Sequence, residues 1–443
     1  MHRTAALLLL LLFSAGASAA TAWTGTSRHA VTAGTGDVLQ PGGATLSLSA
    51  ESTGEAAFVG AITSVDAARF QGRDLRLRGS VLTREGKGIA ALWLRADGPD
   101  ARLGFASSAG QPVRVGEGAQ SREVRLYVPA GTATVKLGVT LNSPGRVEVA
   151  DLALTAESAG GEGISAYDML APALAIIREN ALNAGNVDWP MQQQRLLTPA
   201  LKELPAAEAY SRIREVLDAL ADRHSFLQRP HEASTYRDTA IATRAIESRQ
   251  LHDIGYVLVP GLRGTHARDG EAFATQLCEQ VAARAPSSTR GWIVDLREDT
   301  GGNMWPMLNG LHALLGADEV GAFRNREGVT TRWRSRPSKA CAVDLSQSPV
   351  AVLLGPKTAS AGEALAVAFR ARPGTRFFGL PTAGRATSNR AYPLPDGGAL
   401  RLTTAVVLDR SGDAYPQGIT PEHRVAADQD AIDVAAAWLR SLP

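Results

Sequence analysis

The segment that decides the fold covers residues 348–389 and reads SPVAVLLGPKTASAGEALAVAFRARPGTRFFGLPTAGRATSN. Residues 349–354 are a short apolar run rich in Val and Leu, which predicts a buried strand. A Gly-Pro pair interrupts this run, and apolar residues with helical spacing begin at Ala361. Ser360 is therefore expected in a strand-to-helix turn, beside the unpaired amides and the positive dipole end of the helix.

Two interpretations of Ser360 fit this turn. A hydroxyl on a tight turn, with helix amides beside it, can act as a nucleophile whose oxyanion is stabilised nearby. Ser360 and Glu363 also fit the S-x-x-E capping box, in which the serine bonds the N3 amide and the glutamate reaches back. On the residues alone, the cap is the commoner explanation.

The segment 349–369 resembles the active-site segment of the C-terminal-processing (tail-specific) and tricorn-type serine proteases. In that family a strand ends in a small-residue run, [ST]-A-S-A-x-E, whose inner serine is the nucleophile. A G-x-x-T-x-G motif follows in the family, and residues 379–384 read GLPTAG here. The resemblance covers residues 164–443 and implies that Ser360 is a catalytic nucleophile.

A histidine at the end of a predicted helix has a similar family context. Residues 221–227 read ADRHSFL, and the D-x-H-[ST] element resembles the tricorn-like branch, where the histidine is the general base. Without the resemblance, His224 would be a helix C-cap cation. The group that orients His224 is left open, with Asp222, Asp413 and Glu422 as candidates. Tyr415 stands about where the family has an acid.

A glycine-rich turn follows the predicted buried strand GWIVDLR at residues 291–297. It resembles the D-L-R-x-N-x-G-G turn of the family, which supplies an oxyanion-hole amide. The resemblance implies amides of Gly301 or Gly302, together with Ala361, as the oxyanion hole, since side chains would obstruct the approach. A plain Gly-Gly turn is the alternative. Asp299 stands where the family usually has Asn.

The resemblance also separates two branches of the family. The processing branch uses a serine–lysine dyad, but the position of that lysine is Arg385 here, and a guanidinium cannot act as a base. Lys357 lies upstream and does not match the motif. Residues 227–253 leave no room for the usual PDZ domain. The chain therefore resembles a PDZ-less member of the tricorn-like branch.

The domain prediction has three parts after an expected signal peptide at residues 1–20. Residues 21–160 alternate apolar and polar residues in short runs separated by turns, which predicts a β-sandwich, jelly-roll-like, as an accessory domain. A Gly-rich linker leads to a helical subdomain at 164–230, with helices expected near 196–204 and 206–220. The resemblance implies an α/β protease core of the ClpP/crotonase-like type at 231–443.

The composition excludes several classes of protein. Apolar residues make up 44% and charged residues 20% of the chain, and the net charge is +2, as in ordinary soluble proteins. The basic residues are scattered, so no nucleic-acid partner is expected.

Alternating arginines at 324–336 predict a solvated strand face, and binding of a substrate carboxylate is the other possibility. No metal motif is present, and neither metal nor cofactor is expected.

The N-terminal residues predict export. Residues 1–20 have a basic start, an apolar run and an A-x-A cleavage site, typical of a signal peptide, and no later segment reaches membrane-spanning length. A periplasmic or secreted protein is therefore expected. Cys278 and Cys341 could form a disulfide there or remain two buried thiols.

The sequence thus predicts a serine endopeptidase that cleaves a peptide or protein substrate through an acyl-enzyme, and it leaves the oligomeric state open. The second hypothesis is a catalytically inactive family member that binds peptides, or glycans through its N-terminal domain.

Overall fold

The computed structural model describes residues 22–25, 30–50, 59–86, 90–141, 144–158, 160–337 and 342–443. The chain divides into two compact units, Met1–Ala159 and Gly160–Pro443. The expected signal peptide at 1–20 and Cys341 lie outside the described residues, so export and a disulfide stay predictions. Within the described residues, no helix is long and apolar enough to cross a membrane.

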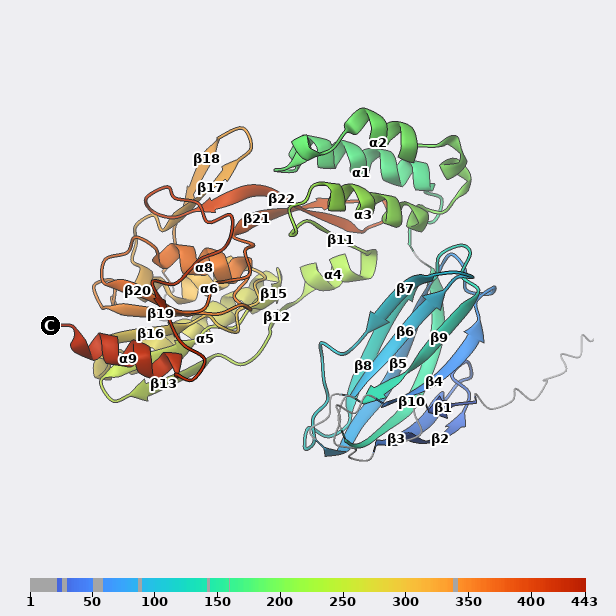
Figure 1. The fold of residues 1–443 in the computed structure, drawn as a ribbon, viewed down its shortest axis with the longest axis horizontal. Helices are drawn as coiled ribbons and strands as arrows, with labels where there is room; N and C mark the ends of the chain where they lie inside the picture. Colours follow the sequence, from blue (N-terminus) through green and yellow to red (C-terminus); the bar gives the residue numbers. More distant parts are fainter. Residues whose placement is uncertain are drawn as a thin grey trace, which may run out of the picture. The chain divides into compact units, whose positions relative to one another are not determined.

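The first unit consists of two five-stranded sheets in which every pairing is antiparallel. Their orders are β1-β4-β9-β6-β7 and β2-β3-β10-β5-β8 (Figure 1). Alternating apolar side chains of both sheets, such as Leu75 and Leu137, meet in one core. The strands are β1 Thr24–Gly25, β2 Ala30–Gly36, β3 Ala44–Ala50, β4 Val59–Asp66, β5 Arg73–Gly86, β6 Ala90–Asp97, β7 Arg102–Ser107, β8 Gln120–Tyr127, β9 Thr134–Leu141 and β10 Gly145–Ser158.

The second unit is built on a six-stranded sheet in the order β13-β14-β16-β19-β20-β23. β13 is an antiparallel edge strand, and the remaining pairings are parallel. The strands are β13 Glu247–Leu251, β14 Ile254–Leu258, β16 Gly291–Asp295, β19 Val350–Leu354, β20 Thr375–Gly379 and β23 His423–Arg424.

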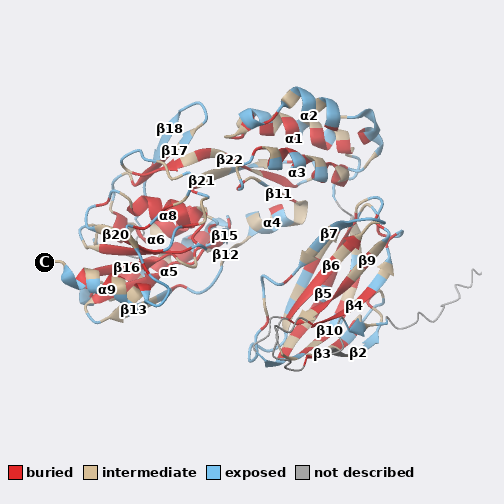
Figure 2. Ribbon diagram, in the orientation of Figure 1, coloured by how far each residue is buried: buried red, intermediate tan, exposed pale blue. Residues whose placement is uncertain are grey.

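Helices cover both faces of this sheet, because its central strands carry apolar side chains on both sides. In β16, Trp292 and Val294 belong to one core and Ile293 to the other. The first core also takes side chains from α5 Ala267–Arg284, α6 Met304–Gly310, α7 His312–Leu315 and α8 Ala361–Phe369, and the second from α9 Ala431–Ser441. Every residue of α8 is buried, as Figure 2 shows.

A second sheet of this unit runs β11-β22-β17-β18, and β21 also pairs with β22. Its strands are β11 Phe226–Gln228, β17 Gly321–Asn325, β18 Thr330–Trp333, β21 Thr387–Pro393 and β22 Ala399–Leu408. Apolar residues of β22, such as Leu400 and Leu402, share a core with α1 Ala166–Asn180 and α3 Ala209–Ala219. The expected helical subdomain therefore belongs to the same compact unit as the sheets.

One predicted helix is wrong. The region expected as a helix at 196–204 contains the end of α2 Trp189–Leu196 and then the 3-10 turn Pro199–Glu203. Asp188 caps α2 by accepting the Met191 N–H, and a proline fits its first turn. The next proline, Pro199, lacks an N–H and disfavours helix in the residue before it, so α2 ends first.

Three smaller elements also belong to the second unit. Helix α4 Pro230–Asp238 follows β11, and β12 Ala240–Ala242 pairs with β15 Leu262–Gly264. Helix α4 and strand β12 lie in the interval 227–253, where the resemblance would place the PDZ domain of a processing protease.

Candidate active site

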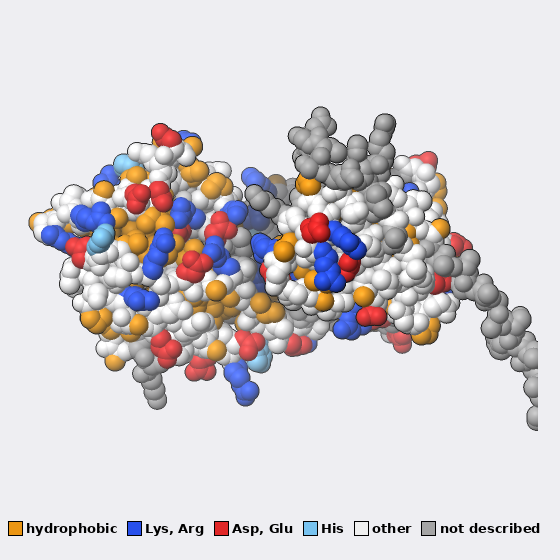
Figure 3. Space-filling model, turned by 90° about the horizontal axis from the view of Figure 1, so that it is seen from below, with side chains coloured by type: hydrophobic (Ala, Val, Ile, Leu, Met, Phe, Trp, Pro, Cys, Tyr) orange, Lys and Arg blue, Asp and Glu red, His pale blue; other side chains and the backbone are white. Residues whose placement is uncertain are grey.

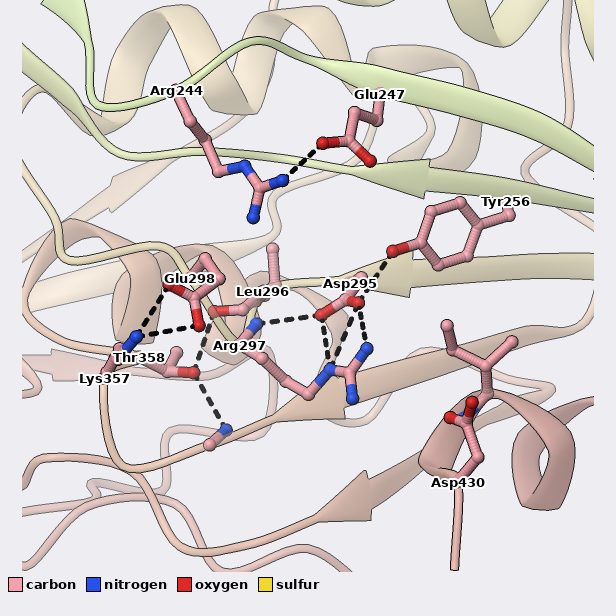
Figure 4. A network of polar contacts seen from close by, with 12 residues as sticks. Arg244, Glu247, Tyr256, Asp295, Leu296, Arg297, Glu298, Lys357, Thr358 and Asp430 are labelled. Carbon is pink, nitrogen blue, oxygen red and sulfur yellow. Dashed lines mark hydrogen bonds and ion pairs between the residues drawn. The ribbon is translucent and has the colours of Figure 1, made fainter. Parts of the chain in front are cut away.

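Ser360 lies in the turn between β19 and α8, as the sequence predicts. Its backbone angles are φ 55° and ψ −114°, a conformation that residues other than glycine rarely adopt. Thr358 ties this turn to the end of β16, because its Oγ1 donates to the Leu296 carbonyl at 2.8 Å and accepts the Gly355 N–H at 3.0 Å (Figure 4). The strained turn is therefore anchored to two strands of the central sheet.

Glu363 fixes the other side of the turn. Its carboxylate is fully buried and accepts the Ser360 N–H at 2.9 Å, the contact expected of a capping glutamate. The same carboxylate accepts the Thr382 hydroxyl at 2.5 Å and the amides of Gly384 and Arg385 at 2.9 and 2.8 Å. One buried carboxyl group therefore holds the GLPTAG segment against the start of α8.

His224 and Ser360 meet in the structure. His224 Nε2 lies 2.9 Å from Ser360 Oγ, and His224 Nδ1 lies 2.6 Å from Thr387 Oγ1. The histidine backbone is held as well, since Asp222 Oδ1 accepts its N–H at 2.9 Å and Asn389 Nδ2 donates to its carbonyl at 2.8 Å. The ring is therefore clamped between two hydroxyls on a fixed backbone.

The surroundings keep this imidazole neutral. Burial and, to a smaller extent, the positive charge of Arg385 lower the pKa of His224 to about 4, although Asp222 opposes both effects. At neutral pH the ring therefore carries one proton. With that proton on Nδ1, facing Thr387, the Nε2 lone pair faces the Ser360 hydroxyl.

The two glycines of the 301–302 turn do different things. Gly301 packs directly on the serine, because a Cβ there would lie 2.9 Å from Ser360 Cβ, and its φ is 94°. Its amide donates to Asp299 Oδ1 at 2.9 Å and is therefore not available to an oxyanion. Among the described residues, no hydrogen bond uses the amides of Gly302 and Ala361. Of the two expected alternatives, this contact favours Gly302 over Gly301, and the amides of Gly302 and Ala361 stay the candidates for the oxyanion hole.

Asp299 is a buried carboxyl group beneath this turn. It is fully buried, and among the described residues its Oδ2 has no hydrogen-bond partner. Burial raises the pKa of Asp299 to about 7, an effect that the hydrogen bond from Gly301 opposes. The backbone carbonyl of Asp299 accepts the Ala359 N–H at 3.0 Å, so the residue connects the glycine turn to the serine turn.

The acids proposed to orient His224 do not contact its ring. Asp222 bonds the backbone of the histidine, Glu422 accepts the Phe377 N–H at 2.8 Å, and Asp413 donates its N–H to Asp409. The residue at Nδ1 is Thr387, which sequence reasoning missed. Its position at the first residue of β21 depends on the pairing with β22, and no local pattern marks it.

Other basic residues singled out in the sequence form ion pairs with glutamates. Lys357 Nζ lies 3.0 Å from both carboxylate oxygens of Glu298 (Figure 4). In the arginine row at 324–336, Arg332 and Arg334 pair with Glu319. These contacts favour the solvated strand face over a grip on a substrate carboxylate for this row.

A cleft of about 860 Å³ in the second unit contains the serine and the histidine. Aromatic and apolar side chains line part of it, among them Phe226, Met304, Trp305 and Phe323. In the described part of the chain, no group of three or more His, Cys, Asp or Glu residues could hold a metal ion.

The second unit is similar to known peptidases. A family model described as Peptidase family S41 matches residues 253–425. The nisin-resistance protein of Lactococcus lactis subsp. lactis is 24% identical over 282 residues, which cover 61% of this chain and 85% of that protein. A carboxy-terminal-processing protease of Bartonella bacilliformis is 27% identical over 199 residues, which cover 44% of each protein.

A solved structure, a lipoprotein from Streptococcus agalactiae, matches with a TM-score of 0.55 and 25% identity over 62% of this chain and 96% of that chain. Taken with the family model and the two relatives, this likeness indicates that the protein is a serine peptidase whose residues 253–425 match peptidase family S41.

Proposed function

We propose that this protein is a serine endopeptidase in which Ser360 is the nucleophile and His224 the general base. The distance of 2.9 Å between His224 Nε2 and Ser360 Oγ, inside a cleft large enough for a peptide, carries this proposal. The lowered pKa of His224 supports it, because the neutral ring can take a proton above about pH 4.

In the proposed reaction, Ser360 Oγ forms a bond to the scissile carbonyl carbon and its proton passes to His224 Nε2. The carbonyl oxygen becomes an oxyanion, for which the amides of Gly302 and Ala361 are the candidate donors. When the C–N bond breaks, the Nε2 proton goes to the leaving amine and an acyl-enzyme remains. A water molecule, deprotonated by the same nitrogen, then hydrolyses the ester and releases the acid.

We assign Thr387 a positioning role in this mechanism. Its Oγ1 lies 2.6 Å from His224 Nδ1 and can accept the Nδ1–H, which leaves Nε2 as the acceptor for the serine proton. A hydroxyl supplies orientation without a negative charge, so it does not raise the pKa of the imidazole as a carboxylate would. The low pKa of His224 is in keeping with this neutral partner.

A fluorophosphonate probe tests the proposal against an inactive binding protein. We expect covalent labelling of the wild type at Ser360, found by peptide mass spectrometry, and none in Ser360→Ala or His224→Ala. Ser388→Ala is the matched control, since Ser388 lines the same cleft but makes no contact with His224 among the hydrogen bonds of the described residues. An unlabelled wild type that still binds peptides would favour the inactive family member.

We infer also that the first unit is a jelly-roll β-sandwich. Without β1 and β2, the sheets read β3-β10-β5-β8 and β4-β9-β6-β7, the order of an eight-stranded double Greek key. The shared apolar core of both sheets supports the sandwich. For the second unit, the mostly parallel sheet covered on both faces supports the proposed ClpP/crotonase-like core. An experimental structure with other strand orders would contradict either inference.

A further inference from the structure

The cleft around Ser360 has a charge of one sign. Four arginines line it, Arg223, Arg263, Arg385 and Arg401, and its lining contains no Asp or Glu. The whole chain, by contrast, has 46 basic and 44 acidic residues. On the face shown in Figure 3, Lys and Arg side chains are interspersed with Asp and Glu. The excess of positive charge in the cleft is therefore shared neither by this face nor by the overall composition of the chain.

These arginines are not neutralised by the protein. Within the described part of the chain, none of the four forms an ion pair, although many other arginines do, such as Arg76 with Glu123. Arg223, Arg263 and Arg385 are exposed. Arg401 is half-buried and held in place, because its Nε donates to Gln228 Oε1 at 2.8 Å.

The four charges extend along the cleft. The charge of Arg385 acts on the imidazole, so this arginine lies near the reacting atoms, and Arg223, which directly precedes His224, lines the same cleft. The Arg401 guanidinium lies 4.2 Å from the ring centre of Tyr236 in α4. Arg263 lies in β15, which also packs on α4. Positive charge is thus present both beside the histidine and beside Tyr236 of α4, which also lines the cleft.

Given the peptidase function proposed above, we propose that this cleft selects peptides that carry carboxylate groups, which bind to Arg263 and the neighbouring arginines. A cleft lined by charge of one sign focuses its field and concentrates ligands of the opposite sign. Arginine suits a carboxylate in particular, because its planar guanidinium donates two parallel hydrogen bonds to the two oxygens. The carboxylate belongs either to an Asp or Glu side chain or to the free C-terminus of the substrate.

Internally quenched peptides distinguish these two sources. One series places Glu or Gln at each position around a central apolar residue, which Trp305 and Phe226, both 44% exposed, can contact in the cleft. A second series compares a free with an amidated C-terminus. We expect kcat/KM to be about 10- to 100-fold higher for the best carboxylate peptide than for its neutral partner. A preference in the first series assigns the site to an acidic side chain, and one confined to the second assigns it to the C-terminus.

Three variants test whether the arginines cause the preference. The measured quantity is the ratio of kcat/KM for the carboxylate peptide to kcat/KM for its neutral partner. Arg263→Gln, alone and with Arg223→Gln, should reduce this ratio about tenfold, and Arg263→Lys should retain most of it. Arg268→Gln is the control, because Arg268 is exposed five residues from Arg263, at the start of α5, but does not line the cleft. A wild-type ratio near one, or a ratio that the double variant retains, would overturn the proposal.

Binding to Ser360→Ala separates this proposal from the catalytic one. If no peptide is cleaved, fluorescence anisotropy with the same labelled peptides still measures the carboxylate preference and its loss in the arginine variants. A preference without cleavage would support the carboxylate site and reject the peptidase mechanism. Cleavage without a preference would support the peptidase mechanism and reject the carboxylate site.

Discussion

Asp299→Asn should remove a pH dependence of stability that the wild type has. The pKa of Asp299 is raised from 3.8 to about 7, mainly because burial disfavours the charged form. A carboxyl group whose pKa is higher in the folded than in the unfolded chain holds its proton more tightly when folded. Its contribution to the free energy of unfolding is therefore largest below pH 3.8 and is lost as the pH rises to about 7.

The size of this loss follows from the shift in pKa. A shift of about three units, at about 1.36 kcal/mol per unit, corresponds to about 4 kcal/mol over the whole window and about 3 kcal/mol between pH 5 and pH 8. An asparagine keeps an oxygen for the Gly301 N–H, which Asp299 Oδ1 now accepts, but has no proton to lose. The variant should therefore be the more stable protein at pH 8 and lose this advantage toward pH 5.

Urea unfolding of both proteins at pH 5, 6, 7 and 8, followed by intrinsic fluorescence, measures the difference. Trp292 is fully buried in the core of the second unit and reports on it. Asp428→Asn, a change at an exposed aspartate, controls for the altered net charge. If the curves of wild type and Asp299→Asn stay parallel within about 1 kcal/mol from pH 5 to 8, Asp299 is not the desolvated carboxyl described here.

Two further predictions concern the histidine. Arg385→Gln should raise the pKa of His224, because it removes a positive charge that lowers this pKa. The acid limb of the profile of kcat/KM against pH should therefore move from about pH 4 to higher pH. An acid limb that does not move would show that burial alone sets this pKa. Thr387→Val should lower kcat by roughly 10- to 100-fold with little change in KM, because the imidazole loses the contact that orients it toward Ser360. Thr387→Ser should restore kcat. A change in KM alone would place Thr387 in substrate binding.

Much of the protein could be predicted from local sequence. The apolar runs at 291–297 and 349–354 identify central strands, because a parallel sheet buried on both faces requires near-continuous apolar residues. The turn at Ser360 follows from the Gly-Pro break between such a strand and a helix. The second helix was misplaced because its start depends on one capping aspartate and its end on a proline.

What the sequence could not supply is contact between distant strands. Thr387 reaches His224 only because β22 pairs with β11 on one side and with β21 on the other. The commitment of the Gly301 amide to Asp299 also depends on how one turn folds onto its own side chain. The positive cleft is another such case, since its four arginines are scattered between residues 223 and 401.

The two interpretations of the S-x-x-E pattern are compatible, and Glu363 is the reason. Its carboxylate accepts the backbone N–H of Ser360, which fixes the turn, while the serine hydroxyl faces His224. The same carboxylate accepts the amide of Arg385, two residues before the threonine that contacts the histidine. A capping residue thus fixes the position of the serine turn relative to the start of β21. A pattern typical of an ordinary helix cap is, for this reason, also what a well-placed serine nucleophile requires.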